Sequence, residues 1–297
     1  MNMLADTSAT VGADGCLWVG EGYTNQIGRL CPTGALTSFS VPTADAYPVS
    51  LVLGPDHAVW FAEYDSDQIG RITTAGQITE FAIPGGGTPS AMAAGGGALW
   101  FLDTQPSRAV SLDEITPAGV VSEFPLTGLP YASGLAWGAG TLWLPDPADN
   151  AILRWTKDGD ALRRFVIPTA KAGAEMITAG PDGALWFTES EAAKIGRIDD
   201  AGRITEYPIP TPTTTPVGIA AGSDGDLWFA DQANNQTFSL GASSPENIGR
   251  ITTRGVITTY PLTSMYGNPD EMAVKSDHLI WFTEMMGGVG RLTFPSG

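Results

Sequence analysis

The chain has 297 residues, and its 32 Asp and Glu outnumber its 15 Lys and Arg, which gives a formal net charge of −17. A surface this acidic repels phosphate backbones and anionic lipid, so we expect neither a nucleic-acid nor a membrane partner. The 37 Gly, 22 Pro and 9 Trp, with only 16% charged residues, are typical of a turn-rich globular β protein.

The beginning of the chain lacks the charged and apolar regions of a signal peptide over its first fifteen residues. We therefore expect a cytoplasmic protein for the chain as it stands, or an exported one if a signal peptide has been removed. No apolar run is long enough to span a bilayer. We expect a monomer.

A short motif with a central Trp recurs along the chain, as in "LWVGE", "VWFAE", "LWFTE" and "IWFTE". Successive Trp residues are 42, 40, 43, 43, 42 and 53 residues apart. Regular self-similarity at this period is the signature of a repeat architecture. The repeat therefore defines seven units with one insertion, and their Trp residues are Trp18, Trp60, Trp100, Trp143, Trp186, Trp228 and Trp281.

Within each unit the same elements follow in order. A turn such as "G-x-D-G" precedes the Trp strand, an "IGRI"-like strand follows, and a strand such as "QITEFAIP" comes after a further turn. Short alternating runs bounded by Gly, Asp and Pro predict antiparallel strands, and four strands in about forty residues are typical of a propeller blade.

The sequence therefore predicts an all-β fold, a single seven-bladed β-propeller of four-stranded antiparallel blades over residues 1–297. The last unit ends at "RLTFPSG", before the turn to a fourth strand. We expect the last blade to lack its outer strand, which leaves an unpaired edge. The predicted blades are residues 4–42, 43–84, 85–126, 127–168, 169–210, 211–262 and 263–297.

Acids and arginines recur at fixed places in these units. An acid stands three residues after each Trp, and seven copies around a ring predict a scaffold role. Arg recurs about eleven residues after Trp, which places it across the hairpin. Stacking on the indole or pairing with the neighbouring acid would stabilise by about 0.5–1 kcal/mol. The third unit has Glu114 where the Arg belongs.

Cys16 and Cys31 are the two cysteines, and they flank the first Trp hairpin. A register that pairs Gly20 with Ile27 also pairs the two cysteines, so a cross-strand disulfide and two small buried thiols are both open interpretations. The two histidines, His57 and His278, occupy matching turns before a Trp strand. We interpret both as turn residues on the face opposite the ligand face rather than as a catalytic base.

The unit "DGALWFTESEAAKIGRIDDAGRITEYPIP" resembles the repeat of the virginiamycin B lyase (streptogramin lyase) family, over nearly the whole chain. The resemblance implies a seven-bladed propeller that opens the ester of a cyclic depsipeptide antibiotic by elimination, with Mg²⁺ assisting. The family's catalytic positions fall on residues of other types, so we do not expect streptogramin lyase activity itself. These positions are Thr7, Val217, Asn268, Asp270 and Met285.

The position that begins each innermost strand carries two acids, Glu175 and Asp270, and Glu271 follows the second. We expect these carboxyl groups at the mouth of the central channel. They are candidate catalytic acid/base groups, and Glu175 and Asp270 are also candidate ligands of Mg²⁺ or Ca²⁺. A hydrated channel rim with scattered acids is the alternative.

Apolar and aromatic side chains on the loops of the same face predict a ligand site. The insertion within residues 231–247 would cap the channel, although such loops are also often disordered. The expected ligand is a small-molecule or peptide-like compound in the central channel. The candidate substrate-binding residues are Tyr64, Tyr131, Tyr266, Met285 and Phe238.

Three functions fit these patterns. The first is a streptogramin-lyase-like enzyme with a rebuilt pocket, which acts on a small or cyclic natural product by elimination, ring opening or a related proton transfer. The second is a non-catalytic propeller that binds a peptide, glycan or protein on its rim, since fold alone does not choose. A sugar-lactone hydrolase with a central Ca²⁺ ranks last, because the inner positions offer few Asn.

Overall fold

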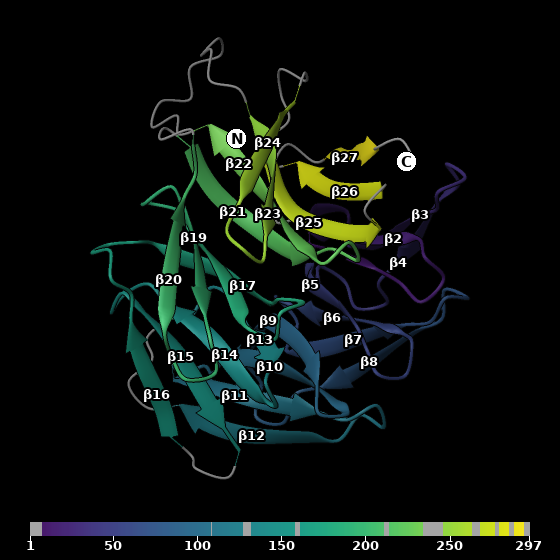
Figure 1. The fold of residues 1–297 in the computed structure, drawn as a ribbon. Helices are drawn as coiled ribbons and strands as arrows, with labels where there is room; N and C mark the ends of the chain where they lie inside the picture. The colour runs from purple at the N-terminus through teal and green to yellow at the C-terminus, as the bar shows by residue number, and fades with distance from the viewer. Residues whose placement is uncertain are drawn as a thin grey trace.

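The structure is a computed structural model that describes residues 8–107, 109–126, 132–157, 161–210, 214–233, 246–262, 268–276, 279–284 and 288–293. Within these residues, six antiparallel sheets have four strands each and one has three. Figure 1 shows the sheets arranged as blades around a common centre. The seven-bladed β-propeller and the three-stranded last blade are both confirmed.

The first four blades follow the chain order without crossovers. Their strands are β1 (Ala9–Val11), β2 (Leu17–Glu21), β3 (Gln26–Leu30), β4 (Leu36–Ser40), β5 (Pro48–Leu53), β6 (Val59–Glu63), β7 (Gln68–Ile72), β8 (Ile78–Ala82), β9 (Thr88–Gly95), β10 (Ala98–Thr104), β11 (Val110–Ile115), β12 (Val121–Leu126), β13 (Ala136–Gly138), β14 (Thr141–Asp146), β15 (Ala151–Thr156) and β16 (Ala161–Val166).

The last three blades continue in the same way, and a short 3₁₀ turn, η1 (Gly22–Thr24), joins β2 to β3. Their strands are β17 (Ala174–Ala179), β18 (Leu185–Glu189), β19 (Lys194–Ile198), β20 (Ile204–Pro208), β21 (Thr214–Ala221), β22 (Asp226–Ala233), β23 (Asn247–Thr252), β24 (Ile257–Pro261), β25 (Pro269–Ser276), β26 (Leu279–Glu284) and β27 (Gly288–Thr293).

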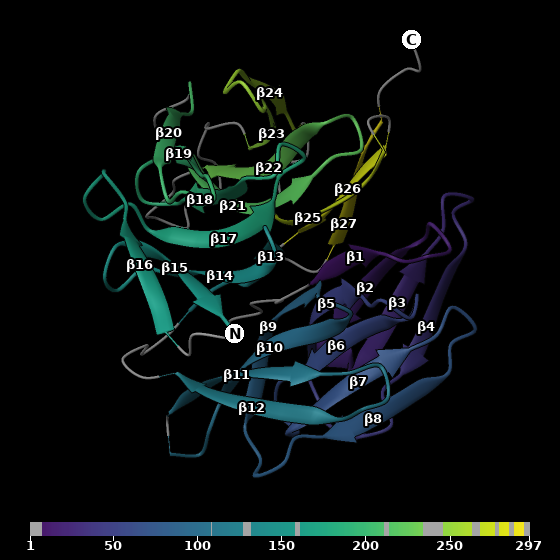
Figure 2. The same cartoon turned by 60° about the horizontal axis from the view of Figure 1, so that its bottom comes forward.

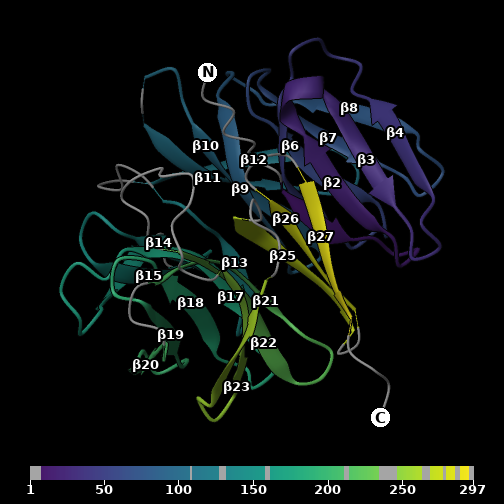
Figure 3. The same cartoon turned by 90° about the horizontal axis from the view of Figure 1, so that it is seen from above.

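The first strand of each blade faces the middle of the ring. In Figure 1 the strands β5, β9, β13, β17, β21 and β25 surround the centre, while later strands such as β8, β12 and β16 lie outside. The last blade lies beside the first, with β25 to β27 next to β1 in Figure 2. The view from above in Figure 3 shows the same neighbourhood of β25 to β27 and β2. The two ends of the repeat therefore meet and close the ring.

The recurrent Trp of each second strand is a core residue. Trp60 is fully buried and stacks on Phe81 of the outer strand, with ring centroids 5.3 Å apart. Trp186 is also fully buried and stacks on Tyr207 at 5.6 Å. Burial of such large rings supplies much of the hydrophobic stabilisation between blades, about 2–3 kcal/mol for each side chain.

The recurrent Arg lies across the hairpin from the Trp, as predicted. Trp60 pairs with Arg71 in the strand register, and the guanidinium lies 5.9 Å from the indole centroid. Its ion-pair partner is Asp56, at 2.6 Å. Of the two predicted contacts, the one with the indole is present. The acid that pairs with the Arg is Asp56 in the turn before the Trp strand, and not the acid after the Trp. That acid, Glu63, lies at the opposite end of the strand, where it pairs with Gln68.

The acid after the Trp is fully buried in five blades, and it is partly exposed at Glu21 and Glu284. Glu63 and Glu189 are fully buried between blades. Burial raises the pKa of Glu63 to about 7, against the lowering effect of a hydrogen bond with Ser66. Burial raises the pKa of Glu189 to about 8, and the nearby Glu206 adds to the shift. Removal of a carboxylate from water disfavours its charged form, which accounts for this direction.

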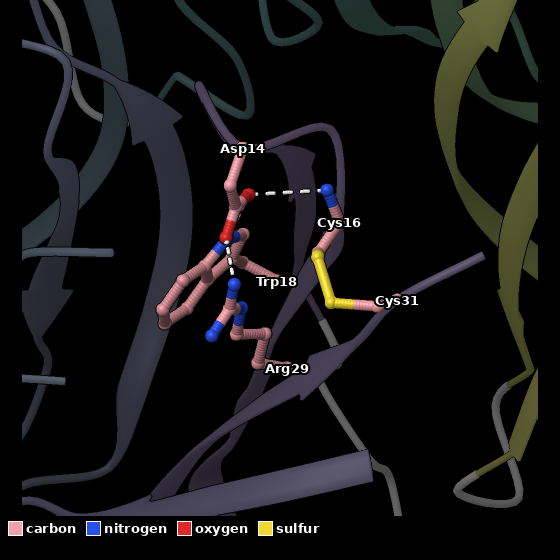
Figure 4. The surroundings of a disulfide bond; sticks show 5 residues. All are labelled: Asp14, Cys16, Trp18, Arg29 and Cys31. Carbon is pink, nitrogen blue, oxygen red and sulfur yellow. Dashed lines mark hydrogen bonds and ion pairs between the residues drawn. A yellow bond between two sulfur atoms is a disulfide. The ribbon is translucent and has the colours of Figure 1, made fainter. Parts of the chain in front are cut away.

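Cys16, just before β2, and Cys31, just after β3, form a disulfide (Figure 4). The Cα atoms of Cys16 and Cys31 are 4.2 Å apart, just beyond the pair that joins Leu17 to Leu30. This decides between the two interpretations of the cysteine pair. Disulfides persist in oxidising compartments, which fits the exported alternative.

His57 lies in the turn between β5 and β6, with a φ of 63°, as expected for a turn residue. Its turn lies at the end of the blade opposite Tyr64, which follows β6. His278 lies outside the described residues. Within the part of the chain that the structure describes, no helix has the length and apolarity that crossing a membrane requires.

Candidate functional site

The innermost strands share an irregularity at the point where they reach the centre of the ring. In β5 the register with β6 shifts between Val49 and Val52, and in β25 the register with β26 shifts between Pro269 and Met272. Comparable shifts occur in β9, β17 and β21. A β-bulge re-aims side chains that regular alternation would send to a blade face. The bulges therefore direct residues from several blades toward the hub.

A cavity of about 240 Å³ lies at this hub. Six blades contribute to its wall, four through their first strands β5, β9, β17 and β25 and two through residues just before β1 and β13, and Tyr64 comes from the connection after β6. Its walls combine hydroxyl, carboxyl and apolar groups. The lining residues are Ser8, Val49, Ser50, Tyr64, Ser90, Ala91, Met92, Ser133, Gly134, Leu135, Met176, Asp270 and Glu271.

Hydroxyl groups at the cavity connect neighbouring blades. The Leu51 backbone N–H donates to the Ser8 Oγ at 2.6 Å, and the Met92 N–H donates to the Ser50 Oγ at 2.7 Å. Each serine therefore caps a backbone donor that the bulge releases in the next blade. The serines hold the innermost strands in place while their side chains remain at the cavity wall.

Asp270 and Glu271 supply the charged groups of the cavity. The Glu271 Oε2 accepts a hydrogen bond from the Ala9 N–H of the first blade at 3.1 Å, and the Thr283 Oγ1 accepts one from the Glu271 N–H at 3.0 Å. Glu271 thus joins the last blade to the first. No Lys, Arg or His stands among the described lining residues, so the cavity has a negative field that favours a positive or proton-donating group.

The Glu175 side chain, unlike those of Asp270 and Glu271, is not among the residues that line the cavity. Its carboxyl group is largely buried, and burial raises its pKa, against the lowering effect of a hydrogen bond with Ser190 in the connection after β18. Its backbone carbonyl accepts a hydrogen bond from the Ser133 Oγ at 2.6 Å. At this bulge Met176, and not Glu175, lines the cavity. The structure thus brings Asp270 and Glu271 to the cavity but does not bring Glu175 to them.

The described residues do not supply the oxygen ligands that the Mg²⁺ implied by the resemblance would need. Among the described residues, no three His, Cys, Asp or Glu side chains are grouped so as to hold a metal ion. Of the three candidate carboxylates, Glu175 is hydrogen-bonded with Ser190, and Glu271 already accepts the Ala9 N–H. A hard divalent ion takes about six oxygen ligands. These described residues therefore do not fit a Mg²⁺ or Ca²⁺ ion.

Of the predicted substrate-binding residues, Tyr64 lines the cavity and is 44% exposed. Tyr131, Tyr266, Met285 and Phe238 lie outside the described residues, as does most of the insertion that was predicted to cap the channel. The sequence interpretation did not assign Ser8 and Ser50 a function. Each follows the position that begins an innermost strand, where Gly, Ala or Ser stands in most units, and this recurrence is the signal that could have indicated them.

The fold and the site define a class: a seven-bladed propeller with a small polar cavity at its hub. The model of the virginiamycin B lyase family matches residues 3–132 and 96–294, and the chain belongs to this family. The recognition of the family from the repeat is confirmed.

Solved relatives share the whole fold. The selenomethionine-substituted virginiamycin B lyase from Staphylococcus aureus is 33% identical, with a TM-score of 0.83 over 99% of this chain and 96% of that one. A catalytically inactive form of the Staphylococcus aureus enzyme, solved with quinupristin, is also 33% identical, with a TM-score of 0.83 over 98% and 96%.

More limited similarities extend this comparison. A virginiamycin B lyase from Streptomyces coelicolor is 45% identical over 49 residues, and the match spans 16% of each chain. A gluconolactonase from Xanthomonas campestris is 16% identical, with a TM-score of 0.53 over 75% of this chain and 81% of that one. The second similarity is one of fold alone.

Proposed function

We propose that this protein is an enzyme that binds a small or cyclic natural product in the hub cavity and opens it by elimination or a related proton transfer, with Asp270 as the general base. One observation carries the proposal: the bulge in β25 brings Asp270 into the same cavity as the hydroxyl groups of Ser8 and Ser50. A carboxylate and hydroxyl donors around one small cavity are the parts that removal of a proton next to a carbonyl requires.

The serines would act on the oxygen side of the substrate. A hydroxyl group has two acceptor lone pairs and one proton to donate. The Ser8 and Ser50 Oγ atoms each accept a backbone N–H through a lone pair, and this interaction does not use the hydroxyl proton, which could be donated to a ligand. Two such donors would stabilise the negative charge that develops on a carbonyl oxygen.

Asp270 would act on the carbon side. Its carboxylate takes the proton from the carbon next to the carbonyl, the electron pair forms a carbon–carbon double bond, and the bond to the leaving oxygen on the next carbon breaks. In a cyclic ester this opens the ring without loss or gain of atoms. A positioned general base contributes about 10²–10⁴-fold to such a step.

The substrate is proposed to differ from the streptogramins. The solved relative with quinupristin shares the fold, but the catalytic positions carried over from the family fall here on Val217, Asn268 and Asp270. The family resemblance implies a histidine at the position of Asp270. A carboxylate there in place of the imidazole keeps a base but changes the charge of the cavity. We therefore expect quinupristin to be a poor substrate, and a compound with a positive or strongly polarised group near Asp270 to be a better one.

The mass of the product tests this proposal. The protein is incubated with a panel of lactones and cyclic depsipeptides, quinupristin included, and the products are separated and weighed by mass spectrometry. Elimination gives an opened product of unchanged mass with new ultraviolet absorbance from the double bond, whereas hydrolysis adds one water. Asp270→Asn should lower the rate by about 100-fold or more, while His57→Ala, on the opposite face, should retain it.

A non-catalytic binding propeller is the second candidate. The observation that favours it is the lack of grouped metal ligands among the described residues, together with the direction of Glu175. If panel compounds bind, as calorimetry would show, but yield no product, this second function is supported. Product formation that survives Asp270→Asn would remove the proposed base.

A further inference from the structure

Three tyrosines form a continuous row that runs to the cavity from the first blade. Tyr23 lies in η1, Tyr47 precedes β5, and Tyr64 follows β6. The rings of Tyr23 and Tyr47 meet edge to face with centroids 5.5 Å apart, and those of Tyr47 and Tyr64 do so at 6.4 Å. Tyr23 is 58% exposed and Tyr64 is 44% exposed. The row is therefore an open aromatic surface that joins the hub cavity through Tyr64.

The fifth blade shows that the fold does not require these rings. There the Ser190 N–H donates to the Gly173 carbonyl at 3.0 Å, just as the Tyr64 N–H donates to the Tyr47 carbonyl at 3.2 Å. The φ angles also match, 66° at Gly173 and 52° at Tyr47. The same turn is thus built from glycine and serine in one blade and from two tyrosines in the other.

Tyr47 occupies a backbone conformation that favours glycine. A bulky side chain at positive φ is an outlier, and such outliers concentrate at functional sites. The ring of Tyr47 also relies on Gly22, since a Cβ at that glycine would lie 2.9 Å from the Tyr47 Cε2. The positive φ of Tyr47 and the missing side chain at Gly22 therefore both help to place the Tyr47 ring between those of Tyr23 and Tyr64.

The charges around the row are all negative. The segments 21–25, 43–50 and 63–68, which carry the three tyrosines, contain four acids besides the buried Glu63, and no Lys, Arg or His. Asp45, Asp65 and Asp67 are exposed. The equivalent of Asp45 in the fifth blade is Lys171, with φ angles of 55° and 54°. Aromatic faces with carboxylates beside them bind organic cations by cation–π attraction and ion pairing.

We propose that Tyr23, Tyr47 and Tyr64 form a binding surface for an extended peptide with lysine or arginine side chains at alternate positions. Alternate side chains of an extended chain are about 6.6 Å apart on one face, close to the 5.5 and 6.4 Å between successive ring centroids. A net charge of −17 attracts such a peptide at long range. This inference does not depend on the cavity being catalytic.

A capped hexapeptide that alternates lysine and alanine is the probe. Its binding to the whole protein is measured by calorimetry at low and at physiological salt, beside a capped peptide with the three lysines in one block, the alternating peptide with acetylated lysines, and spermidine. We expect the alternating peptide to bind at least about tenfold more tightly than the other three, and to weaken as salt rises.

Tyr47→Gly is the decisive variant, because glycine suits the φ of 52° and the fifth blade already uses it there. The variant should stay folded, by circular dichroism and thermal unfolding, and lose about tenfold or more in affinity. Tyr47→Phe should keep most of the affinity. Lys171→Gly relaxes a positive φ of 54° at the fifth-blade position equivalent to Asp45. It is the control for backbone relaxation away from the tyrosines and should leave binding unchanged.

The opposite results would overturn the proposal. Wild-type affinity in folded Tyr47→Gly, equal binding of the blocked or acetylated peptide, or no binding of the alternating peptide would each do so. Equal binding of spermidine would show a general attraction of cations to an acidic protein, and the aromatic row would then have no specific role.

Discussion

The glycine of the "IGRI" strands shows how one residue sets the packing of a blade. Gly196 pairs with Phe187 in the register of β18 and β19, and a Cβ at Gly196 would lie 2.1 Å from the Phe187 ring. The ring is fully buried, and protein interiors are packed closely enough that a shift of such a ring is costly. The same close contact recurs at Gly70, Gly249 and Gly290.

We expect Gly196→Ala to lower the free energy of unfolding by about 1–3 kcal/mol, the usual cost of overpacking. Urea unfolding measures this. The control is the same Gly196→Ala substitution in a Phe187→Leu background, where a smaller side chain replaces the ring that the new Cβ would meet. If Gly196→Ala costs the same stability in both backgrounds, the contact with Phe187 is not the cause.

The adjacent acids Asp270 and Glu271 should have different roles, Asp270 in the proposed reaction and Glu271 in the stability of the ring. Loss of the Glu271 carboxylate leaves the Ala9 N–H without its partner between the last and first blades, so Glu271→Ala should cost about 1–3 kcal/mol of stability. Glu271→Gln retains an acceptor oxygen and should recover most of it. Thermal unfolding of both variants checks this, and equal losses would show that the hydrogen bond does not stabilise the ring.

The sequence predicted Glu175, Asp270 and Glu271 at the hub, and the structure has only Asp270 and Glu271 among the residues that line the cavity. Alternation assigns side chains to faces only while a strand is regular. At Glu175 and Met176 the bulge breaks the alternation, so either side chain could have faced the cavity. The structure has Met176 there. The row of three tyrosines was likewise only partly predictable from the sequence, because Tyr23 belongs to a different unit of the repeat from Tyr47 and Tyr64.

At the scale of elements, the first hairpin is the one that a covalent bond reinforces. The disulfide closes a separation of 15 residues, for which restriction of the unfolded chain gives about 3 kcal/mol. The variant with Cys16→Ser and Cys31→Ser should therefore unfold at lower urea concentration by about that free energy. Reductant should destabilise the wild type and leave the variant unaffected. A wild type that is insensitive to reductant would contradict this.

The blade itself was the most predictable element. The constant offset between Trp and Arg predicted their cross-strand pairing, because both positions depend only on hairpin length. The acid that binds the Arg was assigned wrongly. In five of the seven units an acid stands on each side of the Trp. The acid in the turn, such as Asp182 at 2.7 Å from Arg197, lies at the same end of the hairpin as the Arg. Distinguishing them requires the strand direction in three dimensions.

For the whole molecule, the spacing of the Trp residues predicted seven blades and a closed ring. The cavity was not predictable in the same way, because it depends on how bulges from separate blades converge. The residues that line it are up to 263 positions apart, from Ser8 to Glu271. No local pattern relates them. Family resemblance pointed to Asp270, and it did so through position rather than chemistry.

The buried carboxyl groups make stability depend on pH. Burial raises the pKa of Glu63 and Asp103 to about 7 and that of Glu189 to about 8. The folded state therefore binds these protons more tightly than the unfolded chain. This stabilisation is present below the ordinary carboxyl pKa of about 4 and is lost as pH rises through about 7–8.

Asp56 and Asp182 limit the stability of the folded protein at low pH. Although burial opposes it, hydrogen bonds with Trp60 and Arg71 hold the pKa of Asp56 below its usual range. Its stabilisation is lost as pH falls below about 4. We expect the highest unfolding temperature near about pH 5 and a lower one at about pH 8. Glu189→Gln should flatten this dependence. An optimum above neutral pH would contradict the assignment.

The proposed proton transfer by Asp270 is tested most directly by isotope exchange. A cyclic ester that binds the protein is incubated in deuterated water, and the signal of the proton next to its carbonyl is followed by nuclear magnetic resonance. With the wild type the signal should disappear through exchange or elimination, and with folded Asp270→Asn it should persist at the rate seen without protein. Equal loss of the signal with both proteins would contradict the account.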